Sequence, residues 1–121
     1  MKTALPAKDL PVTDERVEEF MSAIGVGGET FLSGMEQEIY LYAPSGSSIL
    51  FGAPANGTMG DLYNAFADHI ADFDVDYEVE NVRATGFSEH EGMTDEEIEE
   101  FLTDDYAYFQ EIVDSIKEAL G

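Results

Sequence analysis

The sequence predicts an α+β domain in which a small antiparallel sheet packs against three to five helices. Apolar residues recur at the i, i+3, i+4 spacing of a helix face, both near the start and throughout the second half of the chain. The segment of about 30–51 instead contains short β-branched and aromatic runs separated by turn residues. Hydrophobic residues make up 44% of the 121 positions, which is enough for a packed core and argues against disorder.

The first two segments are an arm and a helix. Residues 1–12 contain two prolines and no periodicity, so we expect a flexible arm before one acidic domain over 13–121. A helix over about 13–24 follows, because Thr13 is a good N-cap and glycines come directly after Ile24. Its expected buried face is Val17, Phe20, Met21 and Ile24.

The sheet is predicted within about 30–51. Residues 39–42 and 49–51 are typical of strands, and the Pro-Ser-Gly-Ser sequence between them is typical of a turn. Phe31 and Leu32 leave a third strand open, so the sheet is either a hairpin or three-stranded. Because an isolated hairpin is marginal in water, we expect helices to cover one of its faces.

Four helices are predicted in the second half of the chain, over about 58–71, 75–84, 94–102 and 104–120. Thr58 caps the first of them, a Thr94–Glu97 capping box opens the third, and a restart near Asp104 begins the last.

The helix at about 75–84 is one of two assignments for the segment 72–82. Its strict alternation of acidic and apolar residues also fits a half-buried strand. We favour the helix, because a row of like charges on one strand face is unfavourable and valines recur at helical spacing.

The motifs argue against catalysis, cofactors and a dedicated metal site. There is no cysteine. A calcium-loop interpretation starting at Asp72 fails, because Tyr77 stands where the loop needs glycine and Arg83 where it needs glutamate. His69 and His90 are far apart and form no metal-ligand spacing, although His90, between two glutamates, is the better candidate. We expect Tyr63, Tyr106 and Tyr108 to be exposed, and the sequence leaves open whether they form a contact surface.

The charge is the feature that points to function. The chain has 27 acidic residues against 5 Lys and Arg, a formal net charge of −22. Direct binding to nucleic acid or to an anionic membrane is disfavoured, because both require cations. No apolar run is long enough to span a bilayer and no signal-peptide pattern occurs, so we expect a cytoplasmic protein with a basic protein surface as its partner.

Two acidic ridges are the expected partner-binding surface, one over 72–80 and one over 96–105. Residues i and i+4 on a helix rise by about 6 Å, and i and i+2 on a strand by about 6.6 Å. Phosphates follow one another every 3.4 Å or so along a DNA strand, so these intervals are close to every second phosphate. The expected partner-binding residues are Asp72, Asp74, Asp76, Glu78, Glu80, Glu96, Glu99, Glu100, Asp104 and Asp105.

In size, acidity and lack of cysteine the chain resembles small acidic proteins of phages and mobile elements, the class of antirestriction and anti-CRISPR DNA mimics. The helix followed by Phe73-Asp74-Val75-Asp76 and a terminal helix is also similar to hypothetical proteins of conjugative elements. The resemblance implies an inhibitor that occupies the cationic surface of a nucleic-acid-binding protein. Alternatives are an acidic interaction or immunity-type domain with another basic partner, and an acidic domain adapted to salt.

Overall fold

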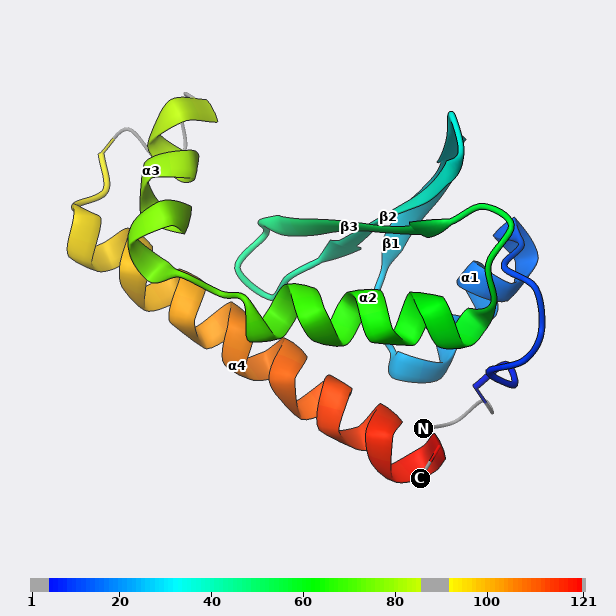
Figure 1. Ribbon diagram of the computed structural model, residues 1–121. Helices are drawn as coiled ribbons and strands as arrows, with labels where there is room; N and C mark the ends of the chain where they lie inside the picture. The colour runs from blue at the N-terminus through cyan, green and yellow to red at the C-terminus, as the bar shows by residue number, and fades with distance from the viewer. Residues whose placement is uncertain (1–4, 86–91, 121) are drawn as a thin grey trace.

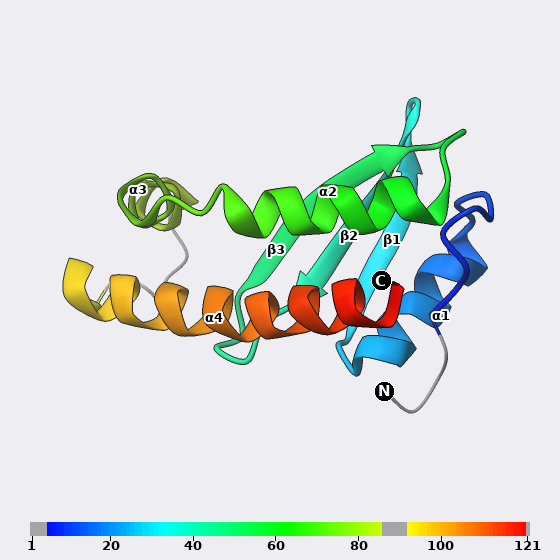
Figure 2. The same ribbon diagram turned by 60° about the horizontal axis from the view of Figure 1, so that its bottom comes forward.

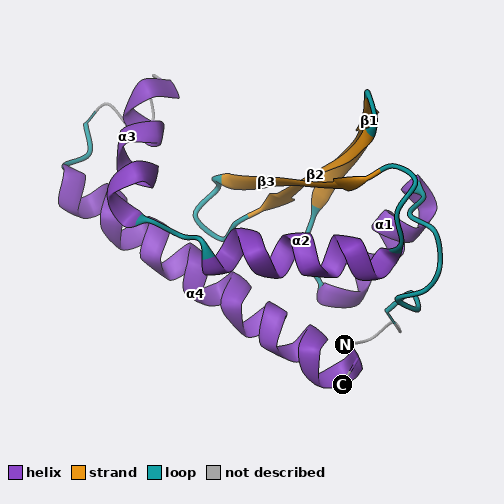
Figure 3. Ribbon diagram, viewed as in Figure 1, coloured by secondary structure: helices purple, strands orange, loops and turns teal. Residues whose placement is uncertain are grey.

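A computed structural model describes residues 5–85 and 92–120 of the chain. It confirms the predicted α+β class, with a three-stranded antiparallel sheet and four helices among these residues (Figure 1). Figure 3 separates the sheet from the helices by colour. The order along the chain is α1 (Asp14–Ile24), β1 (Gly28–Ser33), β2 (Glu36–Tyr42), β3 (Ser48–Pro54), α2 (Met59–Ala71), α3 (Val75–Thr85) and α4 (Asp95–Leu120).

The sheet is a meander in the order β1-β2-β3, so the three-stranded alternative is the correct one. Ile39 in the central strand lies opposite Thr30 of β1 and Phe51 of β3. Alternate residues of β2 and β3 are buried, as expected for strands with one face against the core. The predicted turn between β2 and β3 contains Gly46 at φ 95°, a conformation that glycine adopts without a steric penalty.

Helices α1, α2 and α4 lie on one side of the sheet, whereas α3 stands beyond its end, and aromatic rings join the layers (Figure 1). Phe66 of α2 stacks on Phe51 of β3, with ring centroids 5.2 Å apart. Phe20 of α1 and Phe109 of α4 meet the Phe66 ring edge-on, with ring centroids 6.0 and 6.1 Å from that of Phe66. Since Phe20, Phe66 and Phe109 have no exposed surface, Phe66 is the point at which sheet, α1, α2 and α4 share one core.

The predicted helix starts are confirmed by their caps. The Thr13 side chain accepts a hydrogen bond from the backbone N–H of Arg16, and α1 ends at Gly25 in the left-handed conformation. Thr58 opens α2 with a full capping box. Thr94 and Glu97 form the expected reciprocal pair at the start of α4.

The ambiguous segment is a helix, as favoured from the sequence. The carboxylate of Asp74 accepts hydrogen bonds from the backbone N–H groups of Asp76 and Tyr77 and so caps α3. Val75, Val79 and Val82 are half-buried, and α3 packs against α4.

The predicted break near residue 103 is wrong, because α4 is one helix of 26 residues. Thr103 and Asp104 are exposed positions inside it and carry no cap. No glycine or proline interrupts the segment. Because its apolar side packs against the rest of the protein along the whole length, a continuous helix is favoured. Its buried residues continue through the expected break: Ile98, Leu102, Asp105, Tyr106, Phe109, Val113 and Ile116.

The described part of the expected arm, residues 5–12, lies along the start of α2. The backbone N–H of Gly60 donates to the Lys8 carbonyl at 2.8 Å, and that of Met59 donates to the Leu10 carbonyl at 2.8 Å. The Tyr63 hydroxyl donates to the Pro6 carbonyl at 2.5 Å, and Val12 is buried. These contacts are mainly backbone contacts, which a search for side-chain periodicity does not detect.

The C-terminal half of α4 runs beside α2 in the opposite direction, whereas its N-terminal half extends past α2 toward α3 (Figure 2). The long helix therefore has one side against the core and the other facing solvent along its whole length.

Candidate interaction surface

The first expected ridge does not form a single row. Successive residues of a helix are rotated by about 100°, so alternate acids of α3 point to opposite sides. Asp76 and Glu80, one turn apart, are both exposed, whereas Glu78 is half-buried. Asp72 and Asp74 are exposed and precede the helix, where Asp74 serves as its cap.

The half-buried Glu78 differs from the exposed acids of this group in its surroundings. Burial, and secondly the charge of Asp74, raises the pKa of the Glu78 carboxyl above its ordinary value. The Glu78 carboxyl therefore gains a proton more readily than an ordinary glutamate carboxyl does.

The second expected ridge is largely present. Glu96, Glu99, Glu100 and Asp104 are exposed on α4 and, together with Thr103, line a shallow hollow on one side of the helix. The two groups of acids lie near each other, because α3 packs on the N-terminal half of α4. An ion pair at 2.8 Å between Arg83 and Asp95 also joins the end of α3 to the start of α4.

Asp105 is not part of the exposed surface, contrary to expectation. Its side chain is 3% exposed and accepts hydrogen bonds from the hydroxyl of Ser45 at 2.5 Å and from the backbone N–H of Ser45 at 3.3 Å. The position falls on the core-facing side of α4 once the helix is continuous. It fastens α4 to the turn between β2 and β3.

A longer acidic surface, missed by the sequence reasoning, runs along the solvent side of α4. We call it the α4 stripe; its members are Glu97, Glu100, Asp104, Glu111, Asp114 and Glu118, all exposed. Positions 97, 104, 111 and 118 repeat every seven residues, which keeps them on one face. The stripe spans about 30 Å at 1.5 Å per residue. The heptad spacing is visible in the sequence, but a break near 103 divides it.

The expectation that Tyr63, Tyr106 and Tyr108 are exposed is wrong for the first two, and Tyr108 is half-buried, so they do not form a contact surface. Tyr63 and Tyr106 are buried, and burial is the main cause that raises the pKa of each to about 12. The Tyr106 hydroxyl lies 3.3 Å from Nε2 of His69. Burial lowers the pKa of His69 below its ordinary value, against the opposing charge of Asp72, so His69 is a neutral boundary residue at pH 7.

Tyr77 of α3 is exposed, and a group of further exposed aromatic residues lies on the outer face of the sheet. Phe31 and Tyr40 stack with ring centroids 5.7 Å apart, and Tyr42 and Leu50 on the same face are 48% and 42% exposed. Helices α1, α2 and α4 lie on the other side of the sheet (Figure 1). Acids on this outer face, Glu29, Glu36 and Glu38, surround the rings.

Within residues 5–85 and 92–120, no group of three or more His, Asp or Glu side chains is placed to hold a metal ion. His90, the better metal candidate in the sequence, lies outside the described residues. None of the described helices is both long enough and apolar enough to cross a membrane. No protein-family model, curated protein or solved structure matches this chain.

Proposed function

We propose that this protein inhibits a nucleic-acid-binding protein by occupying its cationic surface. The observation that carries the proposal is the α4 stripe, a continuous acidic face on a helix of 26 residues. Electrostatic complementarity of this kind gives fast association that weakens with salt.

The geometry of the stripe supports a phosphate-like role. Its carboxylates follow one another with rises of about 4.5, 6 and 10.5 Å along the helix axis. One strand of DNA offers a charge about every 3.4 Å, so the stripe has a charge density of roughly half a strand over nearly one duplex turn. Because the opposite side of α4 is buried against the core, the charges are held on a fixed line.

The inhibitor is proposed to act by contact and to catalyse nothing. The exposed acids at the α3 end, Asp76, Glu80, Glu96 and Glu99, extend the negative surface around the start of α4. A basic groove that follows α4 would meet them at its edge, so we expect them to modulate the affinity less than the stripe does.

The test is displacement of DNA from a bound protein. Basic proteins from a cell extract are retained on a DNA matrix at about 0.1 M salt, a concentration at which the Debye length is still about 10 Å. Any protein that this chain releases is purified, and its DNA complex is titrated with the chain in a gel-shift assay. We expect the duplex to be released in proportion to the complex formed between the two proteins.

Two variants with equal net charge decide whether the stripe matters. In the stripe variant, the acids of the α4 stripe become the corresponding amides. In the control variant, the same number of exposed acids away from both candidate surfaces become amides: Asp9, Asp14, Glu15, Glu18, Glu19 and Asp68. The proposal requires the stripe variant to lose inhibition and the control to keep it. Equal loss of inhibition in both variants would mean that net charge alone causes the inhibition, and it would refute the proposed role of α4.

The outer sheet face supports a second candidate, an interaction domain for another basic protein. Exposed aromatic rings stack well with arginine, and the acids among them favour a cationic segment. Tyr42→Ser with Leu50→Ser would then abolish binding of the partner while the stripe variant binds it normally. The reverse pattern favours the inhibitor.

A further inference from the structure

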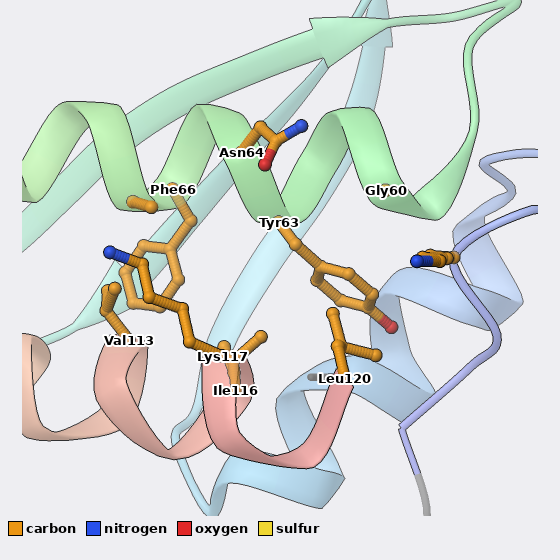
Figure 4. Close-up of a pocket in the computed structure, with 10 residues that line it drawn as sticks. Gly60, Tyr63, Asn64, Phe66, Val113, Ile116, Lys117 and Leu120 are labelled. Carbon is orange, nitrogen blue, oxygen red and sulfur yellow. The ribbon is translucent and has the colours of Figure 1, made fainter.

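A cavity of about 340 Å³ lies between α2, the C-terminal half of α4 and the segment before α1 (Figure 4). Its volume is at the lower end of the range for small-molecule sites, about 300–1,000 Å³. The floor is apolar: Phe66 is fully buried, and Val113 and Ile116 are nearly so. Figure 4 shows Lys117 rising from α4 toward α2 beside Val113 and Phe66, while Tyr63 and Leu120 lie at the other end.

The charged residues that line this cavity are positive, whereas the protein as a whole is strongly negative. Lys8 and Lys117, two of the chain's five basic residues, line it, and no Asp or Glu does. Three other hollows on the surface each include at least one glutamate. On α2 the positions that face the cavity are Gly60, Tyr63, Asn64 and Ala67, one helix face without a carboxylate.

Neither lysine has an acidic neighbour in the lining of the cavity, although the chain has 27 acidic residues. Within the described part of the chain, neither Lys8 nor Lys117 forms an ion pair with a carboxylate. Lys8 is held beside the cavity by its backbone, because its carbonyl accepts from the N–H of Gly60 at 2.8 Å. A Cβ at Gly60 would lie 3.0 Å from that carbonyl oxygen, so glycine permits this close approach.

We propose that the cavity binds a small amphipathic carboxylate, with its apolar tail on the floor and its head at the ammonium group of one of the two lysines that flank the floor. The ligand class follows from charge complementarity at the rim and from the size and apolar character of the floor. The net charge of the protein opposes an anion from a distance, but at 0.15 M salt the Debye length is about 8 Å and the nearest charges dominate. The proposal is independent of the α4 stripe.

The test uses octanoate as the probe and 1-octanol as its uncharged counterpart, with binding followed by the backbone amide signals of Gly60, Asn64 and Ala67 in an NMR titration. We expect octanoate to shift these signals to saturation and to bind at least about fivefold more tightly than octanol, the ratio given by an ion pair of about 1 kcal/mol. Lys8→Gln with Lys117→Gln should remove that advantage and leave octanol binding unchanged. Lys8→Arg with Lys117→Arg should retain it.

A filled cavity provides the second arm. Ala67→Leu places a larger side chain in the cavity and should abolish the binding of both probes, while the lysine substitutions test the head group even if this variant does not fold. Octanol binding as tightly as octanoate would overturn the proposal. So would octanoate binding that is unaffected by the glutamine substitutions, or signal changes confined to residues outside the cavity.

Discussion

The contact between Asp105 and Ser45 is expected to stabilise the fold by an amount that a double-mutant cycle can measure. Asp105 is 3% exposed and its carboxylate accepts two hydrogen bonds, both from Ser45. Hydrogen bonds to a charged group contribute about 1.5–3 kcal/mol each when one partner is removed. Ser45→Ala removes the hydroxyl and leaves a buried carboxylate with the backbone N–H alone. We expect it to lower the free energy of unfolding by about 2 kcal/mol.

Asp105→Ala should cost a similar amount, and the double variant should cost little more than either single one. The coupling free energy is then about 2 kcal/mol, compared with values of at most 0.5 kcal/mol or so for independent sites. The Ser45 hydroxyl also accepts from the backbone N–H of Ser47, a contribution that the cycle subtracts. The free energies come from urea unfolding followed by circular dichroism.

Asp104→Ala is the matched control, since it removes the same charge and makes the same helix substitution one position away, at an exposed site. We expect it to change stability by no more than about 0.5 kcal/mol. The reasoning is refuted if the coupling between Ser45 and Asp105 is below about 0.5 kcal/mol, or if Asp104→Ala is as destabilising as Asp105→Ala.

Three further predictions concern stability. The thermal midpoint should rise as NaCl increases from about 10 mM to 0.15 M, because screening shortens the Debye length from about 30 to 8 Å. Both amide variants carry less charge and should show a smaller rise. Equal rises in wild type and variants would contradict self-repulsion as the cause. The stabilising contribution of neutral His69, whose pKa is lowered in the folded state, is present above the unfolded pKa of about 6.5 and is lost as pH falls through the folded pKa. The stability advantage of wild type over His69→Asn should therefore shrink between pH 7.5 and 5.5 or so, and a constant advantage would exclude this linkage. Gly25→Ala should lower the free energy of unfolding by about 1–2 kcal/mol, because the φ of Gly25 is 71° and no atom lies near an added Cβ, which leaves backbone strain as the cause. Gly25→Asn should lower it less in the same urea assay, because asparagine tolerates this conformation better than alanine. Equal losses would argue against backbone strain.

Local patterns predicted most of the fold because the elements carry their own signals. Thr13, Thr58 and Thr94 all cap the helices expected of them. Hydrophobic periodicity located the buried faces of α1 and α2, and the turn around Gly46 placed β2 beside β3. Each of these features depends on residues within a few positions of one another, so the sequence contains the whole cause.

The candidate surface was less predictable, because exposure depends on which side of a helix meets the core. The acids at 97, 104, 111 and 118 form one line only if α4 is continuous. Thr103 followed by two aspartates is typical of a helix N-cap and first turn, so this local signal predicts a new helix at that point. A break there places the seven-residue repeat of acids on two separate helices. Packing of the apolar side of α4 against α2 and α3 overrides the signal.

The sequence by itself determined an acidic α+β domain with a net charge of −22 and the positions of its helix caps and turns. Only the tertiary structure decided which charges are available to a partner. It buried Asp105 under Ser45, turned Glu78 inward and aligned the rest of α4 toward solvent. It also gathered Lys8 and Lys117, more than a hundred positions apart, around one apolar cavity. Charge is a property of composition, whereas burial and proximity arise from contacts between segments distant along the chain, which no local pattern records.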